Sequence, residues 1–323
     1  MKRLVLLACG LFLLPLTLVQ AAEEYPNRPV KIIVPWPAGG ATDTTARIMA
    51  AKLFTSLRQP FIVENRAGAT GTIGTQSVAQ AVPDGYTLLF MSASSHSVTP
   101  NMLKLAYDAI EDFTPISVTT IFPFVLTVSP DSPYQNVKDL IRAAKEQPGK
   151  ITYGSSGIGG GAHMVTELFR LAAGIELVHV PYQGGGSMII ADLMSGQLPM
   201  MFDSLPSPLG LIRTGRLRAL AVTSLARSSA VPEVPAMSEF IPGFEGVAWT
   251  GLGGPAKLPK PVIDRLSAAV NKAVTDADYR QKMRDLGADA ASSATPERFH
   301  AFLVKEKARW GKVVAEAKIT VSR

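Results

Sequence analysis

The sequence predicts an α/β protein built from two similar lobes, and three observations carry this prediction. Apolar segments typical of strands alternate with amphipathic segments typical of helices, and the connections between them are short. The unit Val30–Arg47 reads as a strand, a Pro- and Gly-rich turn and a helix. A second unit in the same order begins at Ile151. We therefore expect each lobe to be a mostly parallel sheet flanked by helices.

The individual elements follow from the same patterns. We expect strands at Val30–Val34, Phe61–Glu64, Thr87–Met91, Val125–Val128, Ile151–Tyr153, Leu177–Val180, Met200–Asp203 and Leu217–Thr223. We expect helices at Asp43–Leu57, Ile73–Ala81, Val137–Glu146, Ala162–Ala173, Gly186–Ser195, Pro206–Thr214, Pro261–Thr275 and Pro296–Ala317. Hinges between the lobes are expected in the two Pro- and Gly-rich stretches Pro115–Pro123 and Pro232–Trp249.

The N-terminus has the pattern of an export signal. Lys2 and Arg3 precede an apolar run, Leu4–Val19, and small residues at positions 21 and 22 come before acidic ones. This order predicts a cleaved signal peptide over residues 1–22. An uncleaved anchor is the first alternative. A lipoprotein anchored at Cys9 is the second, although almost no apolar residues precede Cys9.

Composition excludes several function classes. The formal net charge is +6 and the basic residues are scattered, so we expect no nucleic-acid partner. Cys9 is the only cysteine and lies within the predicted signal. The mature chain then has no disulfide, no thiolate metal site and no cysteine nucleophile.

The two glycine-rich turns predict anion-binding sites. Where a strand hands over to a helix, the first backbone N–H groups of the helix lack intrahelical partners, and they favour an anion. Gly39 and Gly40 have no Cβ, so a ligand can approach the main chain closely. If the lobes face each other, both turns line one cleft, together with the loops Ser92–His96 and Tyr182–Ser187.

Enzyme and metal motifs are incomplete. Gly157–Ala162 fits the dinucleotide pattern G-x-G-x-x-A, but no acidic residue ends the next strand to hold a ribose. Gly154–Ile158 departs from the hydrolase pattern G-x-S-x-G at its last position. The four histidines have no metal-ligand spacing. We expect no catalytic residue, no metal and no cofactor.

Several motifs together resemble one family. They are Tyr25-Pro26-x-Arg28-Pro29, Pro35-x-Pro37-Ala38-Gly39-Gly40-x-x-Asp43, Val63-Glu64-Asn65-Arg66, Pro83-Asp84-Gly85-Tyr86, Tyr153-Gly154-Ser155-Ser156-Gly157, Pro181-Tyr182 and Val231-Pro232-Glu233-Val234-Pro235. This order resembles the Bug family, the TctC-type periplasmic receptors of tripartite tricarboxylate transporters. The resemblance covers nearly the whole mature chain.

The resemblance implies a Venus flytrap, the two-lobed periplasmic-binding-protein fold. Lobe 1 would comprise residues 23–120 and 245–323, and lobe 2 residues 121–244. Such a receptor is a periplasmic monomer without enzyme activity that closes on a small organic acid or amino acid and delivers it to the membrane subunits of the transporter. A receptor for a membrane sensor kinase and a secreted α/β enzyme remain as alternatives. The ligand's class, whether dicarboxylate, tricarboxylate, amino acid or aromatic acid, is left open.

The candidate ligand-binding residues combine the predicted cleft loops with this resemblance. They are Trp36, Ala38, Gly39, Gly40, Thr42, Asp43, Ser92, His96, Ser155, Ser156, Gly157, His163, Tyr182, Gly184 and Asp203. Two readings stay open for the acids. Asp43 either caps its helix or holds a water or a ligand ammonium group. Asp203 is either an acceptor for a bond across the lobes or a partner for a ligand amine. Trp36 either covers the ligand or packs near the hinge.

Overall fold

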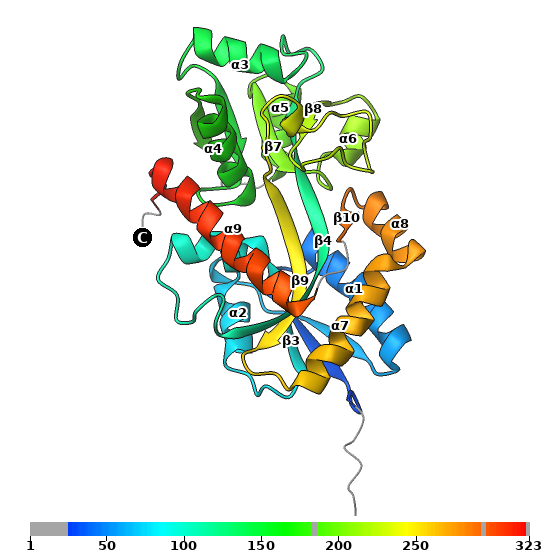
Figure 1. Cartoon of the computed structure of the whole chain (residues 1–323). Coiled ribbons are helices and arrows are strands. Elements are labelled where there is room, and N and C mark those ends of the chain that lie inside the picture. The colour runs from blue at the N-terminus through cyan, green and yellow to red at the C-terminus, as the bar shows by residue number, and fades with distance from the viewer. Residues whose placement is uncertain (1–24, 183–185, 292–294, 321–323) are drawn as a thin grey trace, which may run out of the picture.

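The computed structural model describes residues 25–182, 186–291 and 295–320, and within them two α/β lobes are stacked end to end (Figure 1). Two long strands run from one lobe into the other. They are β4 (Phe113–Val128) and β9 (Val247–Pro255), which pair antiparallel. The predicted signal peptide, residues 1–22, lies outside the described residues.

The sheet of the first lobe has the strand order β2-β1-β3-β9-β4. Strands β1 and β2 pair in parallel, as do β1 and β3, whereas β9 runs antiparallel to both β3 and β4. A short strand, β10, adds to β4. The bounds of the remaining strands are Val30–Val34 for β1, Phe61–Asn65 for β2, Thr87–Ser92 for β3 and Asp289–Ala290 for β10.

The sheet of the second lobe uses the other half of β4. Strand β5 pairs in parallel with β6 and with β7, while β7 and β8 both pair antiparallel with β4. Both sheets are therefore mixed, and the expectation of mostly parallel sheets needs this correction. The cause is the pair of strands shared between the lobes. The bounds are Thr152–Ser155 for β5, Val178–Pro181 for β6, Met200–Ser204 for β7 and Arg218–Val222 for β8.

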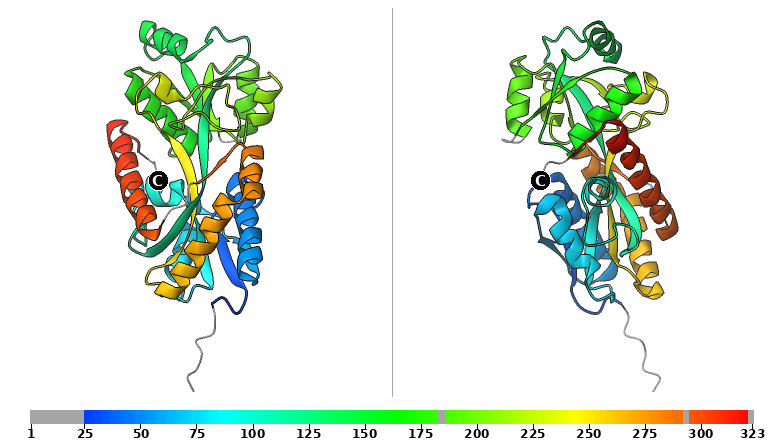
Figure 2. Two further views of the ribbon diagram at one scale, coloured as in Figure 1. Left: turned by 45° about the vertical axis from the view of Figure 1, so that its right-hand side comes forward. Right: turned by 90° about the vertical axis from the view of Figure 1, so that its left-hand side faces the viewer.

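Helices cover both faces of each sheet (Figure 2). In the first lobe, α1, α7 and α8 pack on one face and α2 on the other. In the second lobe, α3 and α4 cover one face, while α5 and α6 cover the other. The bounds are Ala41–Leu57, Thr72–Ala79, Val137–Glu146, Gly161–Ala173, Gly186–Met194, Leu209–Arg213, Lys260–Thr275 and Ala277–Asp285 for α1 to α8.

The C-terminal helix α9 (Pro296–Glu316) joins the two cores. Its first half places Phe299 and Leu303 in the core of the first lobe. Its second half places Trp310 and Val313 in the core of the second. No helix within the described ranges is both long and apolar enough to span a lipid bilayer.

The expected helices and strands appear close to their predicted bounds. The stretch Pro115–Pro123, expected to contain a hinge, is part of the continuous strand β4, which passes from one lobe into the other. The strands β9 and β10 and the helix α8 were not predicted. The pattern of β9 is hidden by glycines such as Gly251, whose missing side chain leaves room for the ring of Phe299. The lobe boundaries, after residue 120 and before residue 245, stay a prediction.

A buried threonine ties the crossing strands together. The Thr223 hydroxyl accepts a hydrogen bond from the N–H of Phe124 at 2.8 Å and lies 2.7 Å from the carbonyl oxygen of Gly246, to which it donates. We expect Thr223→Val to lower the free energy of unfolding by about 1–3 kcal/mol, because it leaves two backbone groups without partners. Urea unfolding followed by circular dichroism measures this change.

The matched control is Thr214→Val at the exposed end of α6, where the hydroxyl donates to Gly210 at 2.8 Å. We expect a change within about 0.5 kcal/mol there, since water replaces the lost bond. Equal losses in both variants would contradict a special role for Thr223.

Candidate functional site

A cavity of about 250 Å³ lies where the two lobes meet. The first lobe contributes Ser94, which follows β3, and the second contributes Ser156, Asp203 and Ser204. Phe124 and the first residues of β9 belong to the shared strands that also line it. Loops from both lobes and the strands between them thus enclose one space. This is the candidate site.

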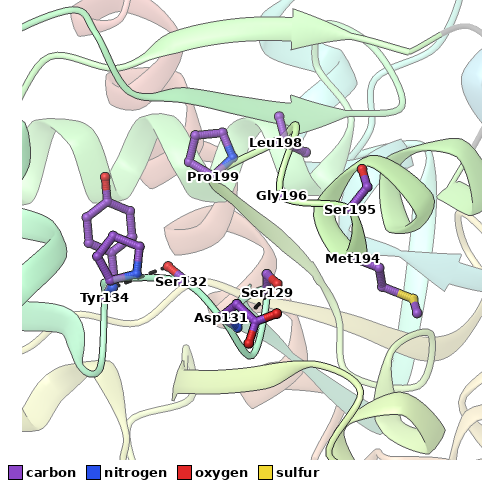
Figure 3. A pocket seen from close by; sticks show the side chains of 10 residues that line it. Ser129, Asp131, Ser132, Tyr134, Met194, Ser195, Gly196, Leu198 and Pro199 are labelled. Atoms are coloured by element: carbon purple, nitrogen blue, oxygen red, sulfur yellow. Dashed lines mark hydrogen bonds between the residues drawn. The ribbon is translucent and has the colours of Figure 1, made fainter.

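A larger cavity of about 340 Å³ lies elsewhere (Figure 3). Its lining comes only from residues 129–134 and 194–199, both within the second lobe. It contains no helix N-terminus and none of the residues predicted for the site. We therefore assign the site to the cavity between the lobes, despite its smaller volume.

The N-terminus of α4 opens into the interlobe cavity. Gly161 and Ala162, the first residues of the helix, line it, and the N-cap residue Gly160 offers no side chain to cap the helix. The first N–H groups of α4 are consequently available to a ligand. Side chains cap α3, α8 and α9, whereas α1, α2, α6 and α7 lack a side-chain cap as α4 does. The capping residues are Asn136, Asp276 and Thr295.

The N-terminus of α1 has the same construction. Its N-cap is Gly40, again without a side-chain cap, and the turn from Pro37 to Ala41 is exposed. The indole N–H of Trp36 donates to the Ser92 hydroxyl at 3.3 Å, which joins this turn to the end of β3. Ala93 and Ser94 come next and line the cavity. The α1 turn thus lies at the edge of the sheet that faces the second lobe.

The two turns share one further contact. The N–H of Gly39 donates to Asp43 Oδ2 at 2.9 Å, and the N–H of Gly159 donates to His163 Nδ1 at 3.2 Å. Each acceptor is the third residue of its helix, and each glycine precedes the N-cap with a positive φ of 85° or 78°. In each turn, the side chain of the third helical residue accepts a hydrogen bond from the glycine before the N-cap. The first N–H groups of the helix itself remain free.

Asp43 is fully engaged within the chain. Besides the N–H of Gly39, its carboxylate accepts from Arg47 and Asn65, and only 3% of the residue is exposed. Burial opposes ionisation, but hydrogen bonds from Arg47, Gly39 and Asn65 outweigh it and hold the pKa of Asp43 below its usual value. These contacts favour a structural role for Asp43 in the turn before α1. They leave the first N–H groups of the helix uncapped, so Asp43 is not a helix cap in the strict sense.

His163 packs against the turn that precedes α4 and is not among the residues that line the cavity. Its ring is 4.3 Å from that of His179, which in turn stacks on Tyr153 at 4.9 Å. His179 Nε2 is 2.7 Å from the Ser155 hydroxyl, and this hydroxyl accepts from the N–H of Gly157. Burial, followed by the neighbouring His179, lowers the pKa of His163 to about 4. The neutral imidazole can then accept from Gly159. His163 and Ser155 therefore shape the turn.

The loop after β3 divides between core and cavity. His96 is completely buried between Phe113 and Trp249, and burial lowers its pKa to about 3. Its Nδ1 is 2.8 Å from the Ser95 hydroxyl, which lies 3.0 Å from that of Ser92. His96 and Ser92 thus belong to the framework. Ser94, which was not predicted individually, lines the cavity, because successive residues of a helical turn point in different directions.

The other predicted residues have different positions. Ser156, which follows β5, and Asp203, in the last part of β7, both line the cavity. The Tyr182 hydroxyl donates to Asp192 at 2.7 Å, within its own lobe. Gly184 lies outside the described residues. Within the described residues, no group of three or more His, Cys, Asp or Glu side chains could hold a metal ion.

Two α/β lobes that share strands, with a cavity between them and the N-terminus of α4 in its lining, define a solute-binding protein of the periplasmic type. The family model described as the tripartite tricarboxylate transporter family receptor matches residues 45–319. The chain belongs to this family, and the predicted membership is confirmed.

Solved structures agree with this assignment. The periplasmic binding protein BugD is 34% identical, with a TM-score of 0.75, over 92% of this chain and 99% of BugD. Rpa4515 of R. palustris, solved with adipate, is 33% identical, with a TM-score of 0.79, over 92% and 99% of the two chains. MatC of Rhodopseudomonas palustris, solved with malate, is 31% identical, with a TM-score of 0.74, over 90% and 100%. The two-lobed fold is confirmed.

The buried histidines predict acid sensitivity. The pKa of His163 falls from 6.5 to about 4 on folding, so between these values the unfolded state binds more protons. The free energy of unfolding should therefore fall as the pH falls from 6.5 to 4. His96 adds to this trend, since burial lowers its pKa as well. Melting temperatures across this range measure the effect.

The variant His163→Gln separates the contribution of His163. Glutamine at this helix position can still accept from the Gly159 N–H but does not titrate. We expect a shallower dependence of melting temperature on pH than in the wild-type protein. An identical slope would contradict the role assigned to His163.

Proposed function

We propose that the protein is a periplasmic receptor that binds a small carboxylate between its lobes and delivers it to a tripartite tricarboxylate-type permease. The observation that carries the proposal is the N-terminus of α4, which lines the cavity with Gly161 and Ala162 and has no side-chain cap. A carboxylate bound there would accept hydrogen bonds from the free N–H groups of the helix. Adipate and malate, the ligands of two solved relatives, both carry carboxylates.

The energetics suit reversible capture. A helix N-terminus stabilises an anion by about 0.3–1 kcal/mol when exposed and by up to about 2 kcal/mol when partly buried. The hydroxyls of Ser94 and Ser156 add neutral donors from opposite lobes. A ligand bound to both lobes would favour the closed arrangement, because it gains contacts that the open one lacks. A second carboxylate would suit the uncapped N-terminus of α1.

The proposed cellular role follows from membership of the receptor family. Export through the predicted signal over residues 1–22 would place the receptor in the periplasm, where its membrane partners can reach it. Uptake of a bound acid by cells that contain the permease should depend on this receptor. Normal uptake in cells that lack the receptor would contradict delivery while leaving ligand binding intact.

The variant Gly40→Val tests the turn before α1. A Cβ at Gly40 would meet only Pro37 O, at 3.8 Å, so the variant should fold. Its side chain would cover the free N–H groups, and we expect the affinity for a dicarboxylate to fall at least about tenfold, in line with losing charged hydrogen bonds. Calorimetric titration with the tightest acid from a thermal-shift screen measures this.

The control is Gly210→Val in α6, where a Cβ would meet nothing within 4 Å, so this variant should fold as well. We expect it to bind as the wild-type protein does. Unchanged affinity in Gly40→Val would remove the α1 turn from the site.

Closure can be tested in solution. If the ligand bridges the lobes, the population should shift toward a more compact arrangement. We expect small-angle scattering to give a smaller radius of gyration with a saturating ligand than without one. The same radius in both samples would contradict closure.

A further inference from the structure

The interlobe cavity has an unusual charge balance for an anion site. Asp203, at the end of β7, is the charged residue among those described that line it, and none of the described lining residues is basic. A carboxylate ligand therefore enters a space that already contains an acidic group. Two carboxylates in one small cavity repel each other unless they share a proton or another group donates hydrogen bonds to one of them.

Asp203 already accepts hydrogen bonds from within the chain, but its carboxylate can accept more. Its Oδ1 accepts from the N–H of Ser204 at 2.8 Å. Burial raises the pKa of Asp203, while hydrogen bonds from Ser207 and Ser204 oppose the rise. A carboxylate has about four acceptor positions, so further donors can be accommodated. The described residues that line the cavity around it offer hydroxyls but no cation.

We propose that the ligand itself supplies the missing donor, and that the site selects acids with an amino or hydroxyl group beside a carboxylate. The inference rests on the proposed function, since it assumes that a carboxylate binds at α4. The ligand carboxylate would accept hydrogen bonds from the N–H groups of Gly161 and Ala162. The neighbouring ammonium or hydroxyl would donate to Asp203. Asp203 is then the residue that determines specificity.

Three acids with the same carbon skeleton test this selection. Succinate, malate and aspartate carry a hydrogen, a hydroxyl and an ammonium at one carbon. We expect malate or aspartate to bind about ten- to hundredfold more tightly than succinate, which corresponds to one hydrogen bond to a charged group. Tricarballylate and citrate form a second pair that differs by one hydroxyl. Calorimetric titration at one pH and salt concentration gives the affinities.

The variant Asp203→Asn gives the decisive comparison. It keeps an acceptor for Ser204 but removes the negative charge. We expect the affinity for aspartate to fall and the affinity for succinate to rise. Structural damage would weaken all ligands alike. The matched control is Asp131→Asn, the same change in the exposed acid of the larger cavity, which should leave every affinity unchanged.

The outcomes separate the two proposals. Binding of succinate as tightly as malate and aspartate, or an unchanged order of affinities in Asp203→Asn, would overturn the selection while leaving a carboxylate receptor in place. If no acid in a panel of mono-, di- and tricarboxylates bound, the proposed function would fail and the selection with it. A rise for aspartate in the variant would also overturn it.

Discussion

The rest of the structure depends on the hydrogen-bonding requirement of β4. This strand is almost entirely buried, so its backbone groups must find partners along the whole length. Its first part pairs with β9, and its last part pairs with β7 and β8. One strand thereby belongs to two sheets. The lobes cannot separate without exposing unpaired backbone, so the proposed closure around a ligand would require β4 and β9 to bend or twist.

The same strands set the position of the site. Phe124 and Val247 line the cavity at the point where the chain crosses, next to the hydrogen bonds made by Thr223. The carboxyl ends of β3, β5 and β7 point toward this region, which is why loop residues from both lobes reach one space. Helix α9 adds a second connection, because Arg309 donates to the carbonyl of Glu245 at 2.7 Å, just before β9.

The sequence allowed prediction of what depends on periodicity and chain order. The amphipathic helices and apolar strands predicted the two-lobed α/β fold. Ser156 and Asp203, which the ends of strands suggested as ligand-binding residues, line the cavity, and their contact with a ligand stays a prediction. The sequence did not allow us to predict which way each side chain of a loop points. His96 and Ser94 lie in the same loop, yet one is in the core and the other lines the cavity. Packing against Phe113 and Trp249 decides this, and both come from distant segments.

The turns before α1 and α4 are held by the same kind of hydrogen bond but by different side chains. Asp43 brings a negative charge to the α1 turn, and the guanidinium of Arg47 at 3.0 Å balances it. His163 holds the α4 turn as a neutral acceptor and adds no charge. This difference matters because Asp203 lines the same cavity as α4. An aspartate in place of His163 would put a second carboxylate near the bound anion, and a neutral imidazole holds the turn without that repulsion.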